Sequence, residues 1–498
     1  MNVCLINPPQ ILNRSLGLPD IFQPLGLLYI AACLEKKYCV SIIDTPSEGL
    51  QSIKKIKGQY YLGLTFEEIE KRIRGLEPDV VGITVPFTVN LESAIQVASM
   101  VKLIDKKIIT ILGGIHPTAC PAETLAFGCV DFVVIGEGED TIQELLRAFI
   151  NYSNENLRNI PGIGFKYKND IVLNSPRDSI KNVDLLPFPA RHLLPMENYF
   201  TAMKTGLAQR KNYIYNNRWA TIITSRGCPY NCNFCSIHGV MGRKFRPRSP
   251  ESVVDEIKHV VQEYDIRHIN FEDDNLTLDK KRAERIFDLM IENKIDVTWS
   301  APNGIRADAI DENLVRKMKL SGCKRVFVAP ESGEMRVLAD IIGKNLDLKK
   351  VEESIKLFRK YKIIVDGSFV IGFIGETKKD IWKTIRYAIK LEKMGLDGVG
   401  FHIATPYYGT RLYEEAKLKG FLREDISVNL FTTAEPLIKT PDWSLNDIRR
   451  LHKIAIVLVK INYRFTKKIA YVLSIFVAVI SRFFRRVFIV RTFCISRF

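Results

Sequence analysis

The chain has 498 residues, of which 46% are hydrophobic and 26% are charged. This composition excludes a fully disordered protein, and the length predicts two to four domains instead of a single core. The formal net charge is +16, but the last 48 residues contain ten basic and no acidic residues, which leaves +6 on the rest. A body so weakly charged does not have the electrostatic footprint of a nucleic-acid-binding protein.

Residues 1–150 alternate short apolar runs with helical patterns, which predicts a doubly wound parallel sheet forming the first domain. Thr65 and Glu68 have the spacing of a capping box and mark the start of the second helix. The predicted strands are 3–6, 40–43, 80–84, 108–112 and 132–135, and the predicted helices are 25–37, 66–76, 91–103, 123–127 and 140–149.

The loops after four of these strands are rich in glycine and proline. In a doubly wound sheet the ligand lies beyond the carboxyl ends of the strands, so these loops form one predicted binding rim. No G-x-G-x-x-G motif follows the first strand, which argues against a dinucleotide ligand. The rim residues are Asn7, Pro8, Thr84, Gly113, Gly114, His116, Pro117, Gly136, Glu137 and Gly138.

A connector is predicted at 151–205, polar at its start and proline-rich at 185–195. Strands and helices alternate again in 206–420, and six such units are too few to close an eight-stranded barrel. We therefore predict an open, partial (β/α)6 barrel, followed by a helical region at 421–498. The predicted strands are 220–224, 268–272, 297–301, 325–329, 363–371 and 398–404, and the predicted helices are 250–263, 280–293, 311–320, 348–361 and 379–393.

Three of the ten cysteines, Cys228, Cys232 and Cys235, form a C-x3-C-x2-C run directly after a predicted strand. Three thiolates on one loop can hold three irons of a cubane cluster and leave the fourth iron open to a small molecule. Zinc is the alternative, with His238 as the nearby fourth ligand, and three structural thiols are the least favoured interpretation. The other cysteines are scattered and no leader segment precedes them, so we expect a reduced, cytoplasmic protein.

The tail contains an apolar run at 469–480 between Lys467-Lys468 and three arginines. Twelve residues are too few to cross a bilayer, which needs about 20. An interfacial helix on an anionic membrane surface explains both the apolar run and the absence of acidic residues. A helix docked on the barrel or on a partner, and a tilted membrane span, are the alternatives.

The cysteine run resembles the C-x3-C-x-aromatic-C signature of the radical S-adenosylmethionine (SAM) superfamily, with Phe234 in the aromatic position. The resemblance implies that the three cysteines ligate a 4Fe-4S cluster whose open iron chelates SAM. Residues 271–275 are similar to an acidic segment of that superfamily, 329–333 to its G-x-E-S-G turn and 371–377 to its G-x-P-G-E-T segment. The residues that the resemblance places near SAM are Phe234, Asp273, Asp274, Glu331, Ser332 and Gly333. For the two aspartates, a helix cap or solvated loop acids are the alternative.

A doubly wound sheet before the barrel resembles the cobalamin-binding branch of this superfamily, the class B methyltransferases and their cyclase relatives. The similarity spans roughly residues 1–420 and implies that the rim residues hold cobalamin. The Asp-x-His-x-x-Gly motif that supplies a histidine to cobalt is absent. The resemblance therefore implies a cobalamin without a histidine lower ligand, with a contact to the corrin edge as the favoured role of a loop residue such as His116.

The implied activity is methylation of an unactivated carbon of a small-molecule or lipid substrate, through a 5′-deoxyadenosyl radical and methylcobalamin, with a flavodoxin- or ferredoxin-type electron donor. A radical cyclase or rearrangement enzyme is the alternative, followed by a non-catalytic cobalamin or iron-sulfur sensor; an RNA methylthiotransferase is disfavoured. The sequence shows no acid-base pair. Tyr407, Tyr408 and Arg411 follow the sixth barrel strand and are candidate substrate contacts, with structural packing as the alternative.

Overall fold

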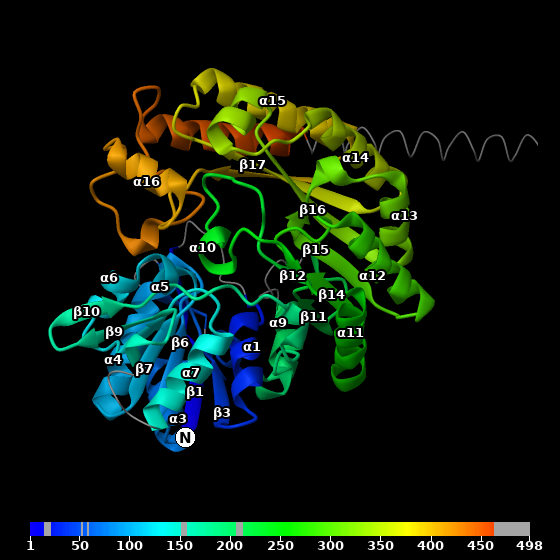
Figure 1. Cartoon of the computed structure of the whole chain (residues 1–498). Helices are drawn as coiled ribbons and strands as arrows, with labels where there is room; N and C mark the ends of the chain where they lie inside the picture. The colour runs from blue at the N-terminus through cyan, green and yellow to red at the C-terminus, as the bar shows by residue number, and fades with distance from the viewer. Residues whose placement is uncertain (14–20, 51–52, 57–58, 151–156, 206–212, 463–498) are drawn as a thin grey trace, which may run out of the picture.

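The computed structural model describes residues 1–13, 21–50, 53–56, 59–150, 157–205 and 213–462. This part of the chain forms two α/β units, drawn in blue to cyan and in green to yellow (Figure 1). The apolar run predicted at 469–480 lies outside the described residues. The domain limits remain predictions.

The N-terminal sheet has seven strands in the order β10-β9-β8-β7-β6-β1-β3. Five of them are parallel, as predicted, and in chain order they have the arrangement 2-1-3-4-5 of a flavodoxin-like fold. The strand order reverses between β1 and β6, which places the expected ligand crevice at their carboxyl ends. The parallel strands are β1 (Asn2–Asn7), β3 (Cys39–Asp44), β6 (Val80–Thr84), β7 (Ile109–Gly113) and β8 (Phe132–Val134).

Helices cover both faces of this sheet. Alternate side chains of a strand point to opposite faces, so Val3 and Leu5 pack with one set of helices and Cys4 and Ile6 with the other. The first set is α1 (Leu25–Leu34) and α7 (Glu139–Ile150), and the second is α3 (Phe66–Leu76), α4 (Leu91–Ile104) and α6 (Pro121–Ala126). The doubly wound prediction is confirmed.

The sequence analysis missed two groups of strands in the N-terminal half, besides the two-stranded β12–β13 sheet, Ser225–Arg226 with Arg246–Pro247. β9 (Ile163–Tyr167) and β10 (Asp170–Leu173) lie in the segment predicted as a connector. They extend the sheet, because β9 pairs antiparallel with β8 and β10 pairs antiparallel with β9. The strands β2 (Gln10–Asn13), β4 (Lys54–Ile56) and β5 (Gln59–Leu62) form a separate small sheet. The β2–β5 and β8–β9 pairings join residues more than 25 positions apart, which local periodicity does not reveal, whereas β9–β10 and β4–β5 are short strands paired with their sequence neighbours.

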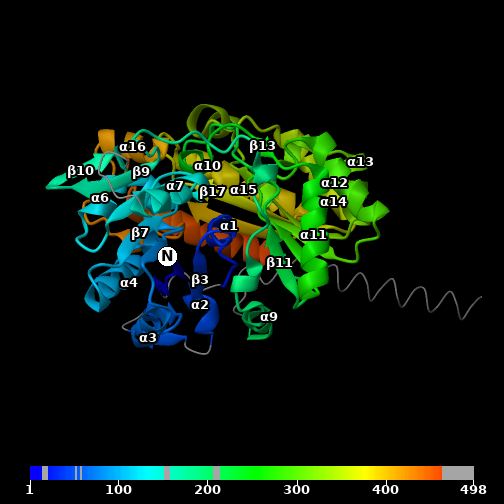
Figure 2. The same ribbon diagram turned by 60° about the horizontal axis from the view of Figure 1, so that its bottom comes forward.

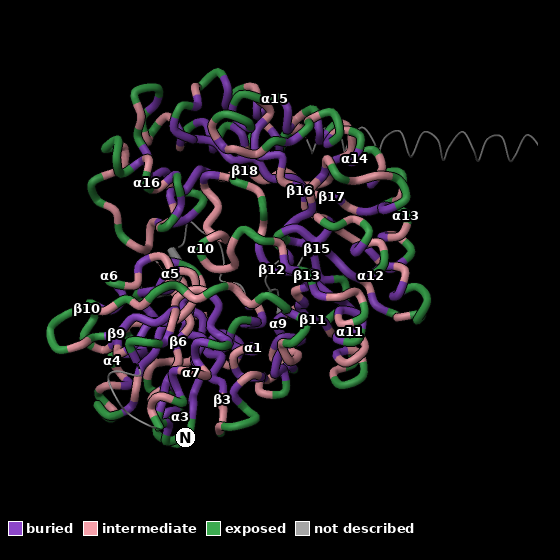
Figure 3. Tube along the Cα trace, in the orientation of Figure 1, coloured by how far each residue is buried: buried purple, intermediate pink, exposed green. Residues whose placement is uncertain are grey.

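The second sheet has six parallel strands in the order β11-β14-β15-β16-β17-β18, which confirms the open partial barrel. The strands are β11 (Trp219–Ile222), β14 (His268–Phe271), β15 (Thr298–Ile305), β16 (Cys323–Glu331), β17 (Ile364–Ile371) and β18 (Gly398–Ile403). The helices between them are α11 (Pro250–Tyr264), α12 (Lys280–Glu292), α13 (Glu312–Leu320), α14 (Leu348–Lys360) and α15 (Lys378–Met394). Figure 3 shows the strands of both sheets as largely buried segments.

The last described helix, residues 445–462, packs on the barrel beside α15 (Figure 1). Its buried face carries Ile448, Leu451, Ala455 and Val459 at helical spacing. Within the described part of the chain, no helix combines the length and apolarity needed to cross a membrane.

Candidate functional site

The three cysteines lie on one loop between the two units. This cysteine loop, residues 227–245, joins β12 (Ser225–Arg226) to β13 (Arg246–Pro247) and contains the short helix α10 (Ile237–Met241). In both views α10 lies between the N-terminal unit and the barrel (Figures 1 and 2). Burial raises the pKa of all three thiols, that of Cys235 to about 12, so binding of iron must release their protons.

Backbone geometry fixes the path of the cysteine loop. Gly227 enters it with φ +79°, and a Cβ there would lie 2.3 Å from the Lys244 carbonyl oxygen. Farther along, the Asn233 backbone N–H donates to the Ile342 carbonyl at 2.8 Å. The Arg411 guanidinium donates to the Asn231 carbonyl. Arg411, a predicted substrate contact, therefore supports the cysteine loop.

The donor set of the loop fits an iron-sulfur cluster, because each thiolate of a cubane binds a different iron. Among the residues that the structure describes, no three His, Cys, Asp or Glu side chains converge as ligands of one ion. His238, considered as a zinc ligand, lies in α10, and its Nε2 is buried without a hydrogen-bond partner in the described structure.

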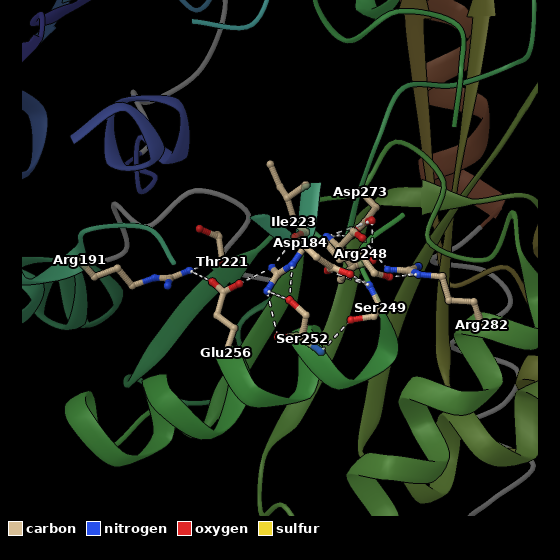
Figure 4. Close-up of polar contacts among 11 residues, drawn as sticks. Asp184, Arg191, Thr221, Ile223, Arg248, Ser249, Ser252, Glu256, Asp273 and Arg282 are labelled. Carbon is tan, nitrogen blue, oxygen red and sulfur yellow. Dashed lines mark hydrogen bonds and ion pairs between the residues drawn. The ribbon is translucent and has the colours of Figure 1, made fainter. Parts of the chain in front are cut away.

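An arginine network supports the chain just before the cysteine loop (Figure 4). β11 is an edge strand, so its outer carbonyl groups have no neighbouring strand to pair with. Guanidinium groups donate to the Thr221 carbonyl in β11 and to the carbonyls of the two residues that follow the strand: Arg191 to Thr221 (2.6 Å), Arg248 to Ile223 (3.1 Å) and Arg282 to Thr224 (2.5 Å). The Thr224 carbonyl also accepts from the Arg248 backbone N–H at 2.9 Å. The buried Glu256 carboxylate forms ion pairs with Arg191 and Arg248.

The two predicted aspartates have different environments. Asp273 is fully buried and accepts hydrogen bonds from the Thr224 hydroxyl (2.7 Å) and the Ser225 hydroxyl (2.5 Å), so its carboxylate is already used. Asp274 is exposed and has no hydrogen bond in the described structure. Neighbouring protein atoms partly desolvate the Asp274 carboxyl, which raises its pKa, and the negative charge of Asp273 raises it further, to about 7. The Oδ1 atom of Asn275 is buried and unpaired among the described residues, which fits a site that awaits a polar ligand.

The 331–333 turn is paired with a cation, Lys344, that the sequence analysis missed. Glu331 has φ +63°, and its carboxylate accepts from Lys344 Nζ at 3.0 Å. The Lys344 ammonium lowers the pKa of Cys232, although burial keeps that pKa raised overall. The only feature of the sequence that could have indicated Lys344 as a partner of Glu331 is its position close to the apolar 337–342 run. Ser332 bonds to Thr384 Oγ1 at 2.9 Å, and both therefore shape the turn against α15.

Aromatic side chains lie on two sides of the cysteine loop. The rings of Phe234 and Phe373, at the end of β17, are 5.6 Å apart. The Tyr408 ring lies 5.8 Å from the ring of His116 and 4.7 Å from that of Phe431. A predicted barrel residue and a predicted rim residue therefore meet between the two units.

A largely apolar pocket with an empty volume of about 900 Å³ opens between the sheets. Six predicted rim residues line it: Thr84, Gly113, Gly114, Gly136, Glu137 and Gly138. The barrel side contributes Ile223, Arg226, Val240 and Met241. A Cβ on Gly136 would have no atom within 4 Å, so this glycine leaves space for a ligand. No described lining residue is a histidine, which fits a cobalamin held without an imidazole.

The remaining rim residues do not line this pocket. Asn7, the last residue of β1, is buried and donates to Asp44 at 2.6 Å, and Pro8, just after the strand, is also buried. His116 bonds through Nδ1 to Thr88 Oγ1 at 3.2 Å, beside the buried Pro117. Burial lowers the pKa of His116 to about 4, so its imidazole is neutral near pH 7.

Comparison with known proteins agrees with this geometry. Residues 222–388 match the model of the radical SAM superfamily, and residues 18–146 match that of the B12 binding domain. An uncharacterized methyltransferase of Pyrococcus horikoshii is 34% identical over 454 residues, which are 91% of this chain and 90% of that protein. Cytidylyl-2-hydroxyethylphosphonate methyltransferase of Streptomyces wedmorensis is 32% identical over 483 residues, which cover 90% of this chain and 88% of the relative.

The fold is also found in a solved structure. The radical SAM methyltransferase TsrM of Kitasatospora setae superposes with a TM-score of 0.65 at 18% identity, over 85% of this chain and 77% of that one. A 4Fe-4S cluster, SAM and cobalamin are thus the cofactors of this enzyme. The chain belongs to the cobalamin-dependent methyltransferases of the radical SAM superfamily.

Proposed function

We propose that this enzyme methylates an unactivated carbon atom of a small-molecule or lipid substrate. The observation that carries the proposal is the junction between the units, where the cysteine loop and the glycine-lined pocket share Val240 and Met241. When bound, the three cofactors supply a carbon radical and a methyl group at this junction. The chain itself binds and orients the cofactors and excludes water.

We assign the cluster ligands to Cys228, Cys232 and Cys235. Phe234 would pack against the adenine, and Asp274, with its open carboxylate, would accept from the ribose hydroxyls or the ammonium of SAM. Asp273, Ser332 and Gly333 would act indirectly, because their polar groups or backbone hold the surrounding turns. Glu331, paired with Lys344, would present a charged edge to the same cofactor.

For cobalamin, the six lining rim residues would make the contacts, and Asn7, Pro8, His116 and Pro117 would shape the loops behind them. Tyr408, between His116 and Phe431, would form one wall of the substrate entrance, with Tyr407 beside it. A flavodoxin- or ferredoxin-type protein would reduce the cluster.

The test is a cofactor assay under anaerobic conditions. Protein reconstituted with iron, sulfide and cobalamin receives SAM, a reductant and a metabolite or lipid extract, and 5′-deoxyadenosine and S-adenosylhomocysteine are quantified. We expect both products from the wild type and neither from Cys232→Ala. Cys39→Ala, an exposed cysteine in β3, is the matched control and should retain both products.

Two outcomes would contradict methylation. Deoxyadenosine without S-adenosylhomocysteine would support a radical cyclase or rearrangement enzyme instead. Neither product from the fully loaded wild type would support a cofactor-binding sensor.

A peripheral contact with an anionic membrane is a second proposal, favoured by an apolar stripe on helix 445–462. Ile454, Val457 and Ile461 are 39%, 53% and 59% exposed and follow helical spacing, directly before the basic residues of 463–498. Such a contact would place the enzyme on the inner face of the membrane and favour a lipid substrate.

Cosedimentation with anionic liposomes tests the stripe. We expect Val457→Ser/Ile461→Ser to weaken binding several-fold, because it removes apolar area from the membrane-facing side. Leu103→Ser, which alters an exposed leucine of α4, should bind like the wild type. Equal binding of all three proteins, or no binding of the wild type, would refute the contact.

A further inference from the structure

One carboxylate joins the pocket wall to both ends of the cysteine loop. Arg226, the last residue of β12, donates to Glu137 Oε1 at 2.7 Å, and Arg246, the first residue of β13, donates to Oε2 at 2.6 Å. The two arginines are directly paired across β12 and β13. Glu137 therefore holds the two bases of the loop on which all three cysteines lie.

These groups are almost completely buried. The side chains of Glu137, Arg226 and Arg246 are 4%, 6% and 3% exposed, and Glu139 balances the charge by pairing with Arg226 at 2.6 Å. Removing charged groups from water costs free energy that apolar packing would not cost. Because guanidinium–carboxylate pairs have a fixed geometry, the arrangement specifies a position as well as an attachment.

The same groups form part of the pocket. Glu137, Glu139 and Arg226 line it, and Met241, another lining residue, accepts through its carbonyl from Arg246 at 2.6 Å. The Ile180 backbone N–H also donates to Glu137, at 2.9 Å. A ligand that fills the pocket therefore contacts the groups that hold the cysteine loop in place.

We propose that Glu137 is a positioning residue that couples cobalamin binding to the ordering of the cysteine loop. Each of the two cofactors, cobalamin and the cluster, then binds more tightly when the other is present, and by the same factor. This inference rests on the proposed function only in requiring both cofactors at the junction.

Hydroxocobalamin titrations followed by absorbance measure the coupling. We expect the wild type to bind hydroxocobalamin at least about fivefold more tightly with a reconstituted cluster than without iron, the lower end of common coupling factors. Glu137→Gln should bind it equally in both states. Glu144→Gln is the matched control, because it removes an α7 ion pair, with Arg177, that does not contact the cysteine loop, and it should keep the wild-type ratio.

A reciprocal readout needs no turnover. Cobalamin should slow the loss of iron from the wild type to a chelator several-fold, and it should have no such effect on Glu137→Gln. If that variant does not fold, Glu137→Gln/Arg246→Met keeps the buried charges balanced and should also show no coupling. Circular dichroism reports whether each variant is folded.

The outcomes separate this inference from the proposed function. A wild-type coupling ratio in Glu137→Gln, or equal affinity of the wild type with and without the cluster, would overturn only the inference. If the wild type bound hydroxocobalamin in neither state, both the inference and the proposed function would be overturned.

Discussion

At the scale of single residues, Gly227 controls the entry to the cysteine loop. Its φ of +79° and the 2.3 Å approach of the Lys244 carbonyl oxygen leave no room for a side chain. We expect Gly227→Ala to retain several-fold less iron after reconstitution, measured by iron analysis, because the loop must shift. Gly239→Ala is the control on the same loop, since a Cβ there meets no atom within 4 Å. Similar iron content in both variants would contradict this role.

The aspartate pair shows what residue-level motifs leave open. Asp273 and Asp274 are adjacent and identical in type, and the sequence gives no reason to separate their roles. The structure separates them because the Asp273 carboxylate accepts from Thr224 and Ser225, in the segment between β11 and the cysteine loop. Asp274 is exposed and has no hydrogen-bond partner among the described residues, so its carboxylate remains available to a ligand.

At the scale of elements, the start of α3 is a local property that the sequence predicted correctly. The Thr65 side chain accepts from the Glu68 backbone N–H at 3.3 Å, and Glu68 accepts from the Thr65 backbone N–H at 2.7 Å. We expect Thr65→Ala to lower the free energy of unfolding by about 1 kcal/mol, measured by urea denaturation. Thr65→Ser keeps a hydroxyl that can cap the helix, so its free energy of unfolding should fall much less. An unchanged free energy of unfolding in Thr65→Ala would exclude a contribution from the cap.

Elements were predicted well where apolar residues are periodic and contacts are short in sequence. The core strands and main helices of both units lie within a few residues of their predicted positions. The prediction failed for β9 and β10, because β10 is a mostly exposed edge strand and only its pairing with β9 places it in the sheet.

At the scale of the whole molecule, one buried histidine in each unit makes stability depend on pH. Burial lowers the pKa of His116 and of His268 from 6.5 to about 4. Below pH 6.5 the unfolded chain takes up these protons while the folded chain does not, so stability is lost as the pH falls toward 4. Between pH 6.5 and 5.5 we expect each histidine to lower the free energy of unfolding by about 1 kcal/mol.

Urea unfolding at both pH values, followed by tryptophan fluorescence, measures this loss. His268→Gln lacks the titrating group, so its free energy of unfolding should fall by about 1 kcal/mol less than that of the wild type over this interval. If wild type and variant had the same pH dependence, His268 would not carry the effect.

The sequence by itself determined the parallel strands of the two large sheets, the N-terminal cap of α3, the cysteine spacing and the glycine loops, because each depends on periodicity or on residues close together in the chain. The tertiary structure alone decided which polar groups remain free and which are used within the protein. It also brought Glu137, in the loop after β8 of the N-terminal sheet, to Arg226 and Arg246 at the bases of the cysteine loop. These residues are about 90 to 110 positions apart, and only the packing of one unit on the other brings such residues together.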